Sequence, residues 1–310
     1  MITLIAFSSI IKKEVMMMYL VIDIGGTYTK YGYYDQDGRY THKDKLKTVK
    51  TNIDEFYASI VSLINEDVEG IAISMPGLLD SRTGLIYAVS LLPFLVNHNI
   101  KEELEKLTCL PVCVDNDAKC AAMGELWKGN LKNICNGLFI VLGSGIGGTL
   151  IINGEIVYSP RFKAGEIGSI LMPLDNRYQE MTNFGRNNNA NTLIHEMSLL
   201  GCEDDGKAVF EFIKTNEKAY DIFEKYCRQI AFMIYNLDYT LDLDAVVIGG
   251  GISEQDILIS TIQSEYKKLR EKYEEDTHAP IITDCKLHND ANLLGALYHY
   301  LKEKELNEFL

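Results

Sequence analysis

The hydrophobic positions of this chain alternate between strand-like and helix-like spacing. An apolar run over 19–24 is followed by a glycine turn and by a second strand-like run that ends at Tyr34. A further strand is predicted around 43–51. Apolar residues then recur every three or four positions over 52–65, which predicts a helix that Asn52 or Asp54 could cap.

The same periodicity predicts the elements of the rest of the chain. Residues 159–190 show no clear period and contain several glycines and two prolines, so they are predicted to be mostly loop. Strands that alternate with helices indicate a mixed α/β fold. The predicted strands are 69–74, 111–114, 244–248 and 279–285, with a three-stranded meander over 137–158, and the predicted helices are 100–107, 118–128, 191–200, 207–215, 218–239, 254–274 and a last one from Asn289.

One pattern occurs twice, about 120 residues apart, at 19–40 and at 137–157. Each copy is an apolar run, a glycine turn, a second strand-like run and a tight turn, Asp37-Gly38 or Asn153-Gly154, before a third run. The repeat predicts two similar lobes with a junction near 114–118. Glycine turns point backbone N–H groups at a ligand, so two of them facing one cleft would suit a polyphosphate. The hypothesis is a two-lobed nucleotide-binding enzyme.

Composition narrows the class of protein. The 310 residues are 47% hydrophobic and 24% charged, which is ordinary for a globular protein. A formal net charge of −14 argues against a nucleic-acid-binding protein. The seven cysteines form no CxxC pair, which favours a reducing cytoplasm over a disulfide scaffold or a zinc knuckle. No apolar run approaches the roughly 18 residues of a membrane span.

The first 17 residues are treated separately. Lys12 and Lys13 follow the apolar stretch, whereas a secretory signal carries its basic residues before it. We therefore predict that residues 1–17 are an N-terminal extension with little structure.

The second glycine turn, Gly143 to Gly148, formally satisfies the dinucleotide fingerprint GxGxxG. That fingerprint needs a helix directly after it, but here β-branched residues and Asn153-Gly154 predict a hairpin. The sequence contains neither a Walker A motif nor an HExxH motif around His195. A third glycine turn, Gly249-Gly250-Gly251, follows a buried strand. Each turn taken singly could also be structural, without a ligand.

Six motifs occur in an order that resembles the ROK family (repressor, open reading frame, kinase) over residues 19–301. The sequence around 161–168 and 294–301 looks most like bacterial β-glucoside kinases. The resemblance implies a two-lobed actin/hexokinase-like (ribonuclease H-like) α/β ATPase fold and transfer of the ATP γ-phosphoryl group to a sugar hydroxyl. The motifs are Asp23-Ile-Gly-Gly-Thr27, Asn116-Asp117-Ala118, Gly143-Ser-Gly-Ile-Gly-Gly148, Gly165-Glu-Ile-Gly168, Gly249-Gly-Gly-Ile252 and Ala291-Asn-Leu-Leu-Gly-Ala296.

The resemblance also implies an organisation. Residues 18–115 with about 296–310 would form the small lobe, and 116–295 the large lobe. The protein would be a cytoplasmic homodimer without nucleic-acid or membrane partners.

On the sugar side, the resemblance implies that Asp117 is the catalytic base and takes the proton of the acceptor hydroxyl, expected to be O6. The alternative is a helix N-cap, for which Asp117 and Asp115 are equally suitable residue types. Glu166 and Asn116 would bind sugar hydroxyls, with Gly77 beside the ring and Ser169 where many family members carry a histidine.

On the nucleotide side, the resemblance implies that ATP and Mg²⁺ bind between the glycine turns. Asp23 would hold the Mg²⁺, directly or through water. Two interpretations of Lys30 stay open, a phosphate contact and a solvated strand position. The other expected ATP-binding residues are Gly25, Gly26, Thr27, Gly143, Ser144, Gly145, Gly147, Gly148, Gly249, Gly250 and Gly251.

The chain departs from the family pattern in three places. One is the family's usual asparagine before the second sugar-side helix, near whose place Val89-Ser90-Leu91 stand. Many members bind a structural zinc through cysteines and that histidine, but Ser169 replaces the histidine and residues 175–192 contain no cysteine. No structural zinc is therefore expected. Without the histidine the substrate is open: glucose or a β-glucoside is expected, with N-acetylmannosamine or fructose as alternatives. A non-catalytic sugar-binding regulator is the competing class, although only 18 residues precede Tyr19, too few for a DNA-binding module.

Overall fold

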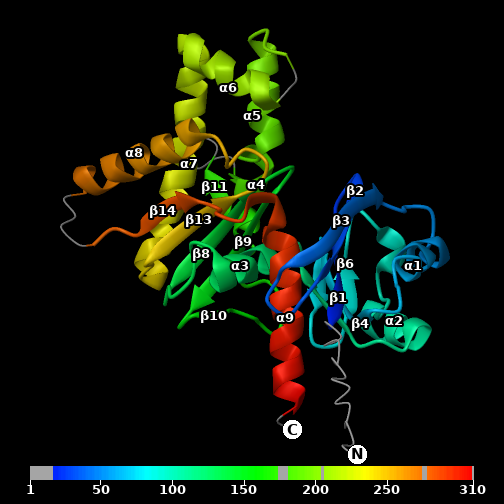
Figure 1. The fold of residues 1–310 in the computed structure, drawn as a ribbon. Helices are drawn as coiled ribbons and strands as arrows, with labels where there is room; N and C mark the ends of the chain where they lie inside the picture. Colours follow the sequence, from blue (N-terminus) through cyan, green and yellow to red (C-terminus); the bar gives the residue numbers. More distant parts are fainter. Residues whose placement is uncertain (1–16, 174–180, 204–205, 274–277, 309–310) are drawn as a thin grey trace, which may run out of the picture.

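The computed structural model describes residues 17–173, 181–203, 206–273 and 278–308. Apart from Met17, the predicted N-terminal extension lies outside the described residues. The chain builds two five-stranded sheets, each flanked by helices (Figure 1). No helix of the described residues is long and apolar enough to cross a membrane.

The first sheet has the strand order β3-β2-β1-β4-β7. Its antiparallel meander is β1 (Met18–Ile24), β2 (Tyr28–Tyr34) and β3 (Tyr40–Lys47). The strands β4 (Val68–Met75) and β7 (Val112–Asn116) follow in parallel. The helices α1 (Ile53–Val61) and α2 (Ile100–Thr108) pack on one face, and Asn52 caps α1 as expected.

The second sheet repeats this plan, with the order β10-β9-β8-β13-β14. Its meander is β8 (Gly137–Leu142), β9 (Ile146–Ile152) and β10 (Glu155–Ile156). The strands β13 (Ala245–Gly249) and β14 (Ile281–Asp284) run parallel to β8. The internal repeat inferred from the sequence is therefore confirmed as a repeat of sheet topology.

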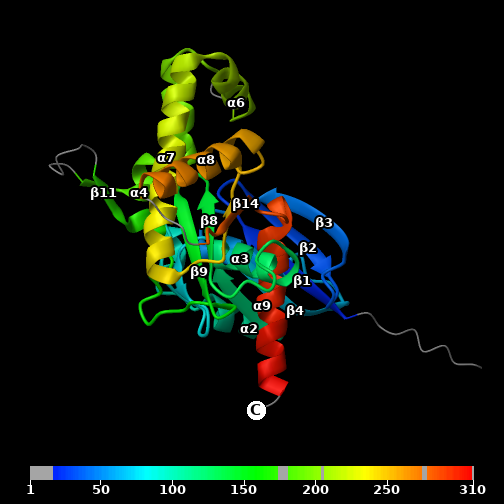
Figure 2. The ribbon, with the colours of Figure 1, turned by 90° about the vertical axis from the view of Figure 1, so that its left-hand side faces the viewer.

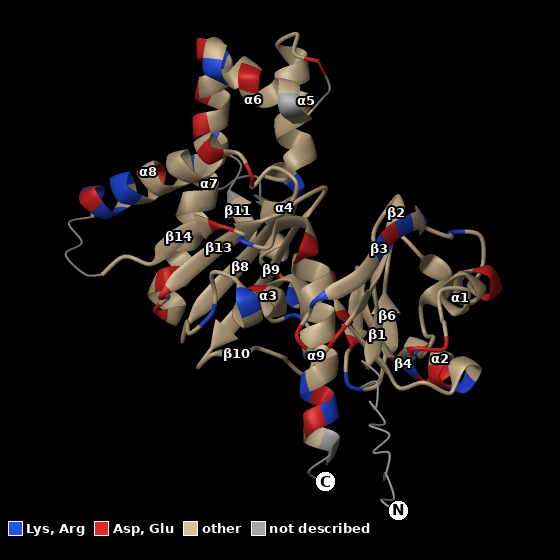
Figure 3. Cartoon of the chain, in the orientation of Figure 1, with Lys and Arg blue, Asp and Glu red and all other residues tan. Residues whose placement is uncertain are grey.

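The outer helices belong mainly to the second sheet. One face of that sheet packs against α7 (Glu217–Leu241) and α8 (Asp256–Lys272). With α5 (Ala190–Leu199) and α6 (Gly206–Thr215), the first part of α7 rises above the sheet as a helical arm (Figures 1 and 2). Acidic and basic residues are interspersed on these outer helices (Figure 3).

Two helices, α3 (Asp117–Lys128) and α9 (Ala291–Glu308), fill the space between the sheets (Figure 1). Because side chains alternate along a strand, Leu20 and Ile22 of β1 face α1 and α2, whereas Tyr19 and Val21 face α9. Alanines of α3 pack on the second sheet in the same way. The last helix of the chain thus completes the core of the first sheet.

Glycines allow α3 and α9 to approach closely. A Cβ on Gly295 would lie 1.6 Å from the carbonyl oxygen of Cys120, and one on Gly124 would lie 2.4 Å from that of Ala291. Both neighbours are backbone atoms, which cannot move aside as a flexible side chain can. The crossing of these helices therefore requires glycine at both positions.

Some segments differ from the sequence-based expectation. The region 159–190 contains a hairpin of β11 (Leu171–Pro173) and β12 (Met181–Asn183) and the short helix α4 (Phe184–Asn187), so it is more ordered than predicted. A hairpin of β5 (Leu78–Asp80) and β6 (Leu85–Ala88) was not predicted. Short 3₁₀ turns lie at Pro93–Leu95, Ile167–Ser169 and His288–Asp290.

We expect Gly295→Ala to lower the free energy of unfolding by about 2–3 kcal/mol, because the added methyl group overpacks the α3–α9 contact. Alanine favours helix over glycine by only about 1 kcal/mol, which is too little to compensate. Urea denaturation measures the difference. Gly206→Ala in α6, where a Cβ meets no atom within 4 Å, is the control. Equal or higher stability of Gly295→Ala would contradict the close contact.

Candidate active site

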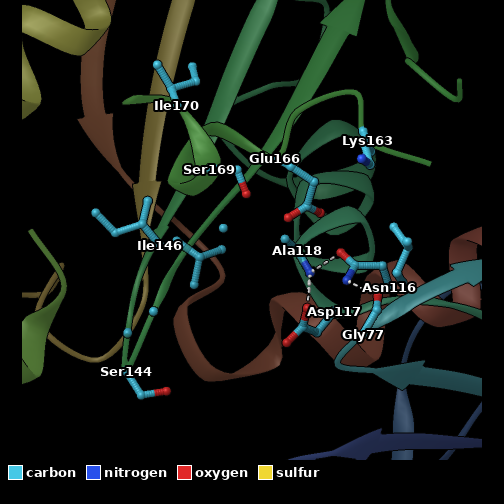
Figure 4. Close-up of a pocket in the computed structure, with 15 residues that line it drawn as sticks. Gly77, Asn116, Asp117, Ala118, Ser144, Ile146, Lys163, Glu166, Ser169 and Ile170 are labelled. Atoms are coloured by element: carbon cyan, nitrogen blue, oxygen red, sulfur yellow. Dashed lines mark hydrogen bonds between the residues drawn. The ribbon is translucent and has the colours of Figure 1, made fainter. Parts of the chain in front are cut away.

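A cavity of about 760 Å³ opens between the two sheets, beside the N-terminus of α3 (Figure 4). Figure 4 shows Asp117 and Asn116 on one side, the Glu166 carboxylate and Ser169 hydroxyl on another, and Ser144 on the turn below. All of the predicted sugar-binding residues, and the predicted phosphate residues of the turn 143–147, therefore meet in one place. The lining residues are Gly77, Leu78, Asn116, Asp117, Ala118, Val141, Gly143, Ser144, Gly145, Ile146, Gly147, Lys163, Glu166, Ser169 and Ile170.

Asp117 is the first residue of α3, and its Oδ1 accepts a hydrogen bond of 2.8 Å from the backbone N–H of Ala118. Burial raises the pKa of Asp117 to about 6, against that hydrogen bond and with help from the negative charges of Asp23 and Glu166. This carboxyl therefore titrates close to neutral pH, where a general base works best.

The N-cap of α3 is Asn116, whose Oδ1 accepts from the N–H groups of Ala118 and Lys119 at 3.0 and 3.2 Å. The alternative that Asp117 or Asp115 caps this helix is therefore wrong. Asp115 is buried in β7 and accepts a hydrogen bond from the Tyr158 hydroxyl instead. Asn116 lies in the extended conformation that precedes a helix, so its short side chain can reach back to both N–H groups.

Asn116 also joins the helix to the turn after β4. Its Nδ2 donates to the carbonyl oxygen of Gly77 at 3.0 Å. Gly77 has a φ of 120°, and a Cβ there would lie 2.5 Å from the carbonyl oxygen of Ala88. The turn therefore requires glycine, and Asn116 positions its backbone beside the cavity.

Glu166 is carried by a loop that packs on β9 through glycines. Gly165, with a φ of 87°, faces Gly148 so closely that a Cβ on either would lie within 2.7 Å of the other's carbonyl oxygen. Gly148 does not line the cavity. Among the expected phosphate residues of this turn, Gly143, Ser144, Gly145 and Gly147 face the cavity and Gly148 packs the Glu166 loop.

Asp23, at the end of β1, is buried and is not among the residues that line this cavity. It forms a polar cluster that the sequence analysis missed. Its Oδ1 accepts from Ser74 Oγ at 2.9 Å and from Asn292 Nδ2 at 3.1 Å, and Asn292 also reaches Ser74 Oγ at 3.2 Å. Burial raises the pKa of Asp23, and the nearby charge of Lys30 opposes that shift. The signal for Asn292 was its place in the last of the six ordered motifs, whereas Ser74 only ended a predicted strand.

A second cavity, of about 390 Å³, joins Lys30 to the third glycine turn and the start of α9. Lys30 Nζ lies 3.9 Å from Asp23 Oδ2, so Lys30 is an ion-pair partner that also lines this cavity. Gly250 adopts a φ of 101°, and a Cβ there would lie 2.2 Å from the carbonyl oxygen of Leu142. All three residues of Gly249-Gly250-Gly251 line the cavity.

The first glycine turn is placed differently. Gly25, Gly26 and Thr27 are not among the residues that line these two cavities. Thr48 holds the turn, because its Oγ1 donates to the Gly25 carbonyl oxygen at 2.7 Å and its N–H donates to that of Thr27 at 3.1 Å. The turn is fixed in shape but lies outside both cavities.

The model of the ROK family matches residues 19–303, and the chain belongs to that family. A β-glucoside kinase of Listeria monocytogenes is 31% identical, with 94% of this chain and 100% of that protein covered. A glucokinase of Halalkalibacterium halodurans is 29% identical, covering 89% of this chain and 93% of that protein. This chain is accordingly a ROK sugar kinase, as the ordered motifs indicated.

Solved structures agree with the family membership and with the fold. A ROK family protein from Streptococcus pneumoniae in complex with sucrose is 30% identical, with a TM-score of 0.84 over 94% of this chain and 100% of that one. A ROK glucokinase from Streptomyces griseus, in complex with glucose and AMPPNP, is 22% identical with a TM-score of 0.73 over 90% and 98%. The hexokinase-like α/β fold expected from the sequence is confirmed.

We expect Asn292→Ala to lower the free energy of unfolding by about 1–3 kcal/mol near neutral pH, because a buried carboxylate loses a hydrogen-bond donor. Losing that donor raises the folded-state pKa of Asp23 further, so the deficit shrinks as the pH falls and the group is protonated in wild type and variant alike. Urea denaturation at about pH 7 and at about pH 5 measures the deficit and its decrease at the lower pH. Asn289→Ala, at an exposed position, is the control, and a deficit independent of pH would contradict the role of Asn292.

Proposed function

We propose that the protein transfers the γ-phosphoryl group of ATP to a hydroxyl, O6, of glucose or a β-glucoside, with Asp117 as general base. The observation that carries the proposal is the position of Asp117 in the cavity. Its carboxyl, with a pKa of about 6, shares that cavity with the glycine turn 143–147 and with Glu166. A base, an anion-binding turn and an acceptor of sugar hydroxyls thus surround one space.

Phosphoryl transfer passes through a loose transition state, so the protein mainly positions the reactants and stabilises charge. As the sugar oxygen bonds to phosphorus and the bond to the leaving ADP oxygen breaks, the hydroxyl proton moves to Asp117. A carboxyl with a pKa near 6 accepts that proton more readily than an ordinary aspartate, whose pKa is about 3.9. The 2.8 Å hydrogen bond from Ala118 fixes the orientation of the carboxylate.

The sugar side of the cavity offers acceptors and donors suited to a polyol. Glu166 and Ser169 come from one loop, Lys163 from the same loop, and Gly77 from the opposite lobe. Serine is shorter than histidine, so it leaves room for a substituent on the sugar. That room favours a β-glucoside, and N-acetylmannosamine and fructose are the alternatives that a substrate panel distinguishes.

The residues around Asp23 fit a hydrated Mg²⁺. Both hydrogen-bond donors to Asp23 reach Oδ1, and the nearest cation to Oδ2, Lys30 Nζ, lies at 3.9 Å. Asp23 Oδ2 therefore accepts neither of these hydrogen bonds, and a carboxylate oxygen of this kind suits a water-mediated Mg²⁺ contact. Bound there, Mg²⁺ would neutralise charge on the phosphate oxygens of ATP. Ser74 and Asn292 orient the carboxylate for that purpose. The remaining parts of the proposal are ATP contacts from the glycine turns 143–147 and 249–251, which line the two cavities, a homodimer and a cytoplasmic location.

A coupled ADP-release assay with glucose, β-glucosides, N-acetylmannosamine, N-acetylglucosamine and fructose tests the proposal. We expect sugar-dependent ADP formation that requires Mg²⁺ and is fastest with glucose or a β-glucoside. Sugar binding without ADP formation, for every member of the panel, would leave the non-catalytic regulator as the function.

Asp117→Asn should reduce kcat by about 10²–10⁴-fold, since the amide cannot accept the proton. The KM for ATP should stay nearly unchanged, because Asp117 faces the sugar side. Asp256→Asn, at the start of α8 and outside the lining of both cavities, is the control for a lost aspartate charge. Near-normal turnover of Asp117→Asn would exclude it as the base.

The pH profile of kcat/KM gives an independent check of Asp117. The deprotonated form is the base, so kcat/KM should rise with pH, reach half its plateau at about pH 6 and fall steadily below it. Glu166→Gln removes one of the charges that raise this pKa, so its midpoint should move to lower pH even though sugar binding weakens. An unchanged midpoint would show that the charge of Glu166 does not raise the pKa of Asp117.

A further inference from the structure

The strand β7, which ends immediately before Asp117, and the helix α9 together carry four side chains of metal-binding type. Cys113 and Asp115 occupy alternate positions of β7 and so share a face, while His299 and Glu303 are four residues apart on α9 and share a side of that helix. Cys113 and His299 are 186 residues apart in sequence. For that reason no ligand spacing along the chain reveals the cluster.

Three of the four groups come together, and the fourth, Asp115, lies beside the histidine. Cys113 Sγ lies 3.2 Å from His299 Nδ1, and Asp115 Oδ2 lies 3.6 Å from the same nitrogen. Cys113, His299 and Glu303 each offer one ligand atom, and these three atoms lie within 4.8 Å of one another. Ligands of a tetrahedral zinc at ~2.0–2.3 Å are separated by about 3.3–3.8 Å. Small side-chain rotations would therefore bring this set to that geometry.

The cluster is buried and already polar. Cys113 and Asp115 are 2% exposed, and the side chain of His299 is 12% exposed. Tyr158 donates to Asp115, and Lys101 Nζ donates to Glu303 Oε2 at 3.0 Å. Glu303 Oε1 lies 3.6 Å from Nε2 of His299, whereas Cys113 lies against Nδ1. Burial, together with the charges of Glu303 and Asp115, raises the pKa of the Cys113 thiol well above its usual range.

We propose that Cys113, His299 and Glu303, with Asp115 as the fourth ligand, bind a transition-metal ion of the Zn²⁺ type. The Cys113 S–H bond breaks as the sulfur–metal bond forms, and the proton leaves to solvent. Thiolate and imidazole are ligands for zinc, cobalt and nickel, whereas Mg²⁺ prefers oxygen ligands. The site is separate from the cysteine-poor segment 175–192 on which the expectation of no structural zinc was based.

The surroundings of the cluster offer access for an ion and indicate what a bound ion would stabilise. A cavity of about 530 Å³ beside α9 is lined by Tyr158, His299 and Glu303, so it leads to the cluster from outside. The bound ion would join α9 to β7, immediately before Asn116 and Asp117. The ion would stabilise the layer of α3 and α9 between the sheets. This metal site does not depend on the proposed function.

Cobalt binding to the full-length protein tests the proposal. Protein freed of metal by chelation is titrated with Co²⁺ in a buffer that contains excess Mg²⁺. The Mg²⁺ saturates the phosphate sites, so that Co²⁺ does not bind there. We expect one equivalent to give a thiolate-to-cobalt charge-transfer band and tetrahedral d–d bands, which Zn²⁺ then displaces. Both ions should raise the Tm. Absence of these bands, or octahedral bands without charge transfer, would overturn the proposal.

Variants assign the ligands. Cys113→Ser should abolish the charge-transfer band, and His299→Gln and Glu303→Gln should each weaken Co²⁺ binding by at least about tenfold. Cys120→Ser is the matched control, because Cys120 is also buried and packs in the same cluster on α9 but is not among the three residues whose ligand atoms come together. A band that survives in folded Cys113→Ser or disappears in folded Cys120→Ser would refute the assignment. Circular dichroism verifies folding, and if Cys113→Ser does not fold, unchanged binding in the other two variants refutes it.

Discussion

The close crossing of α3 and α9 is the constraint on which the rest of the structure depends. Both helices lie between the two sheets, and each contributes apolar side chains to the adjoining cores. They can fit there only because Gly124 and Gly295 let backbone meet backbone. Since Asp117 is the first residue of α3, this packing also sets the position of the base relative to the lobes on either side.

The site follows from where strands end against this middle layer. The end of β7 supplies Asn116, which caps α3 and holds the Gly77 turn, while the β8–β9 turn supplies the glycines opposite. The end of β1 supplies Asp23, held by donors from β4 and from α9. Separate parts of the chain thus fix the carboxylates of Asp117 and Asp23. The repulsion between these two carboxylates contributes to the raised pKa of Asp117.

Periodicity predicted nearly every long element because the apolar faces of strands and helices repeat at fixed intervals. It missed the β5–β6 hairpin, whose strands are short, and it left 159–190 as loop because β11, β12 and α4 are too brief to show a period. The order of motifs found the glycine turns and Asp117. It could not show that Asn116 rather than an aspartate caps α3, or that Gly148 packs a loop, because such roles depend on contacts between distant segments.

The position of α9 has a consequence for how the protein forms during synthesis. One face of the first sheet, with Tyr19 and Val21, is covered by residues such as Leu297 and Tyr300. The ribosome makes that sheet well before the helix that covers it. The nascent chain therefore carries an uncovered apolar surface until α9 has been made, and its first lobe can complete its core only once α9 has left the ribosome.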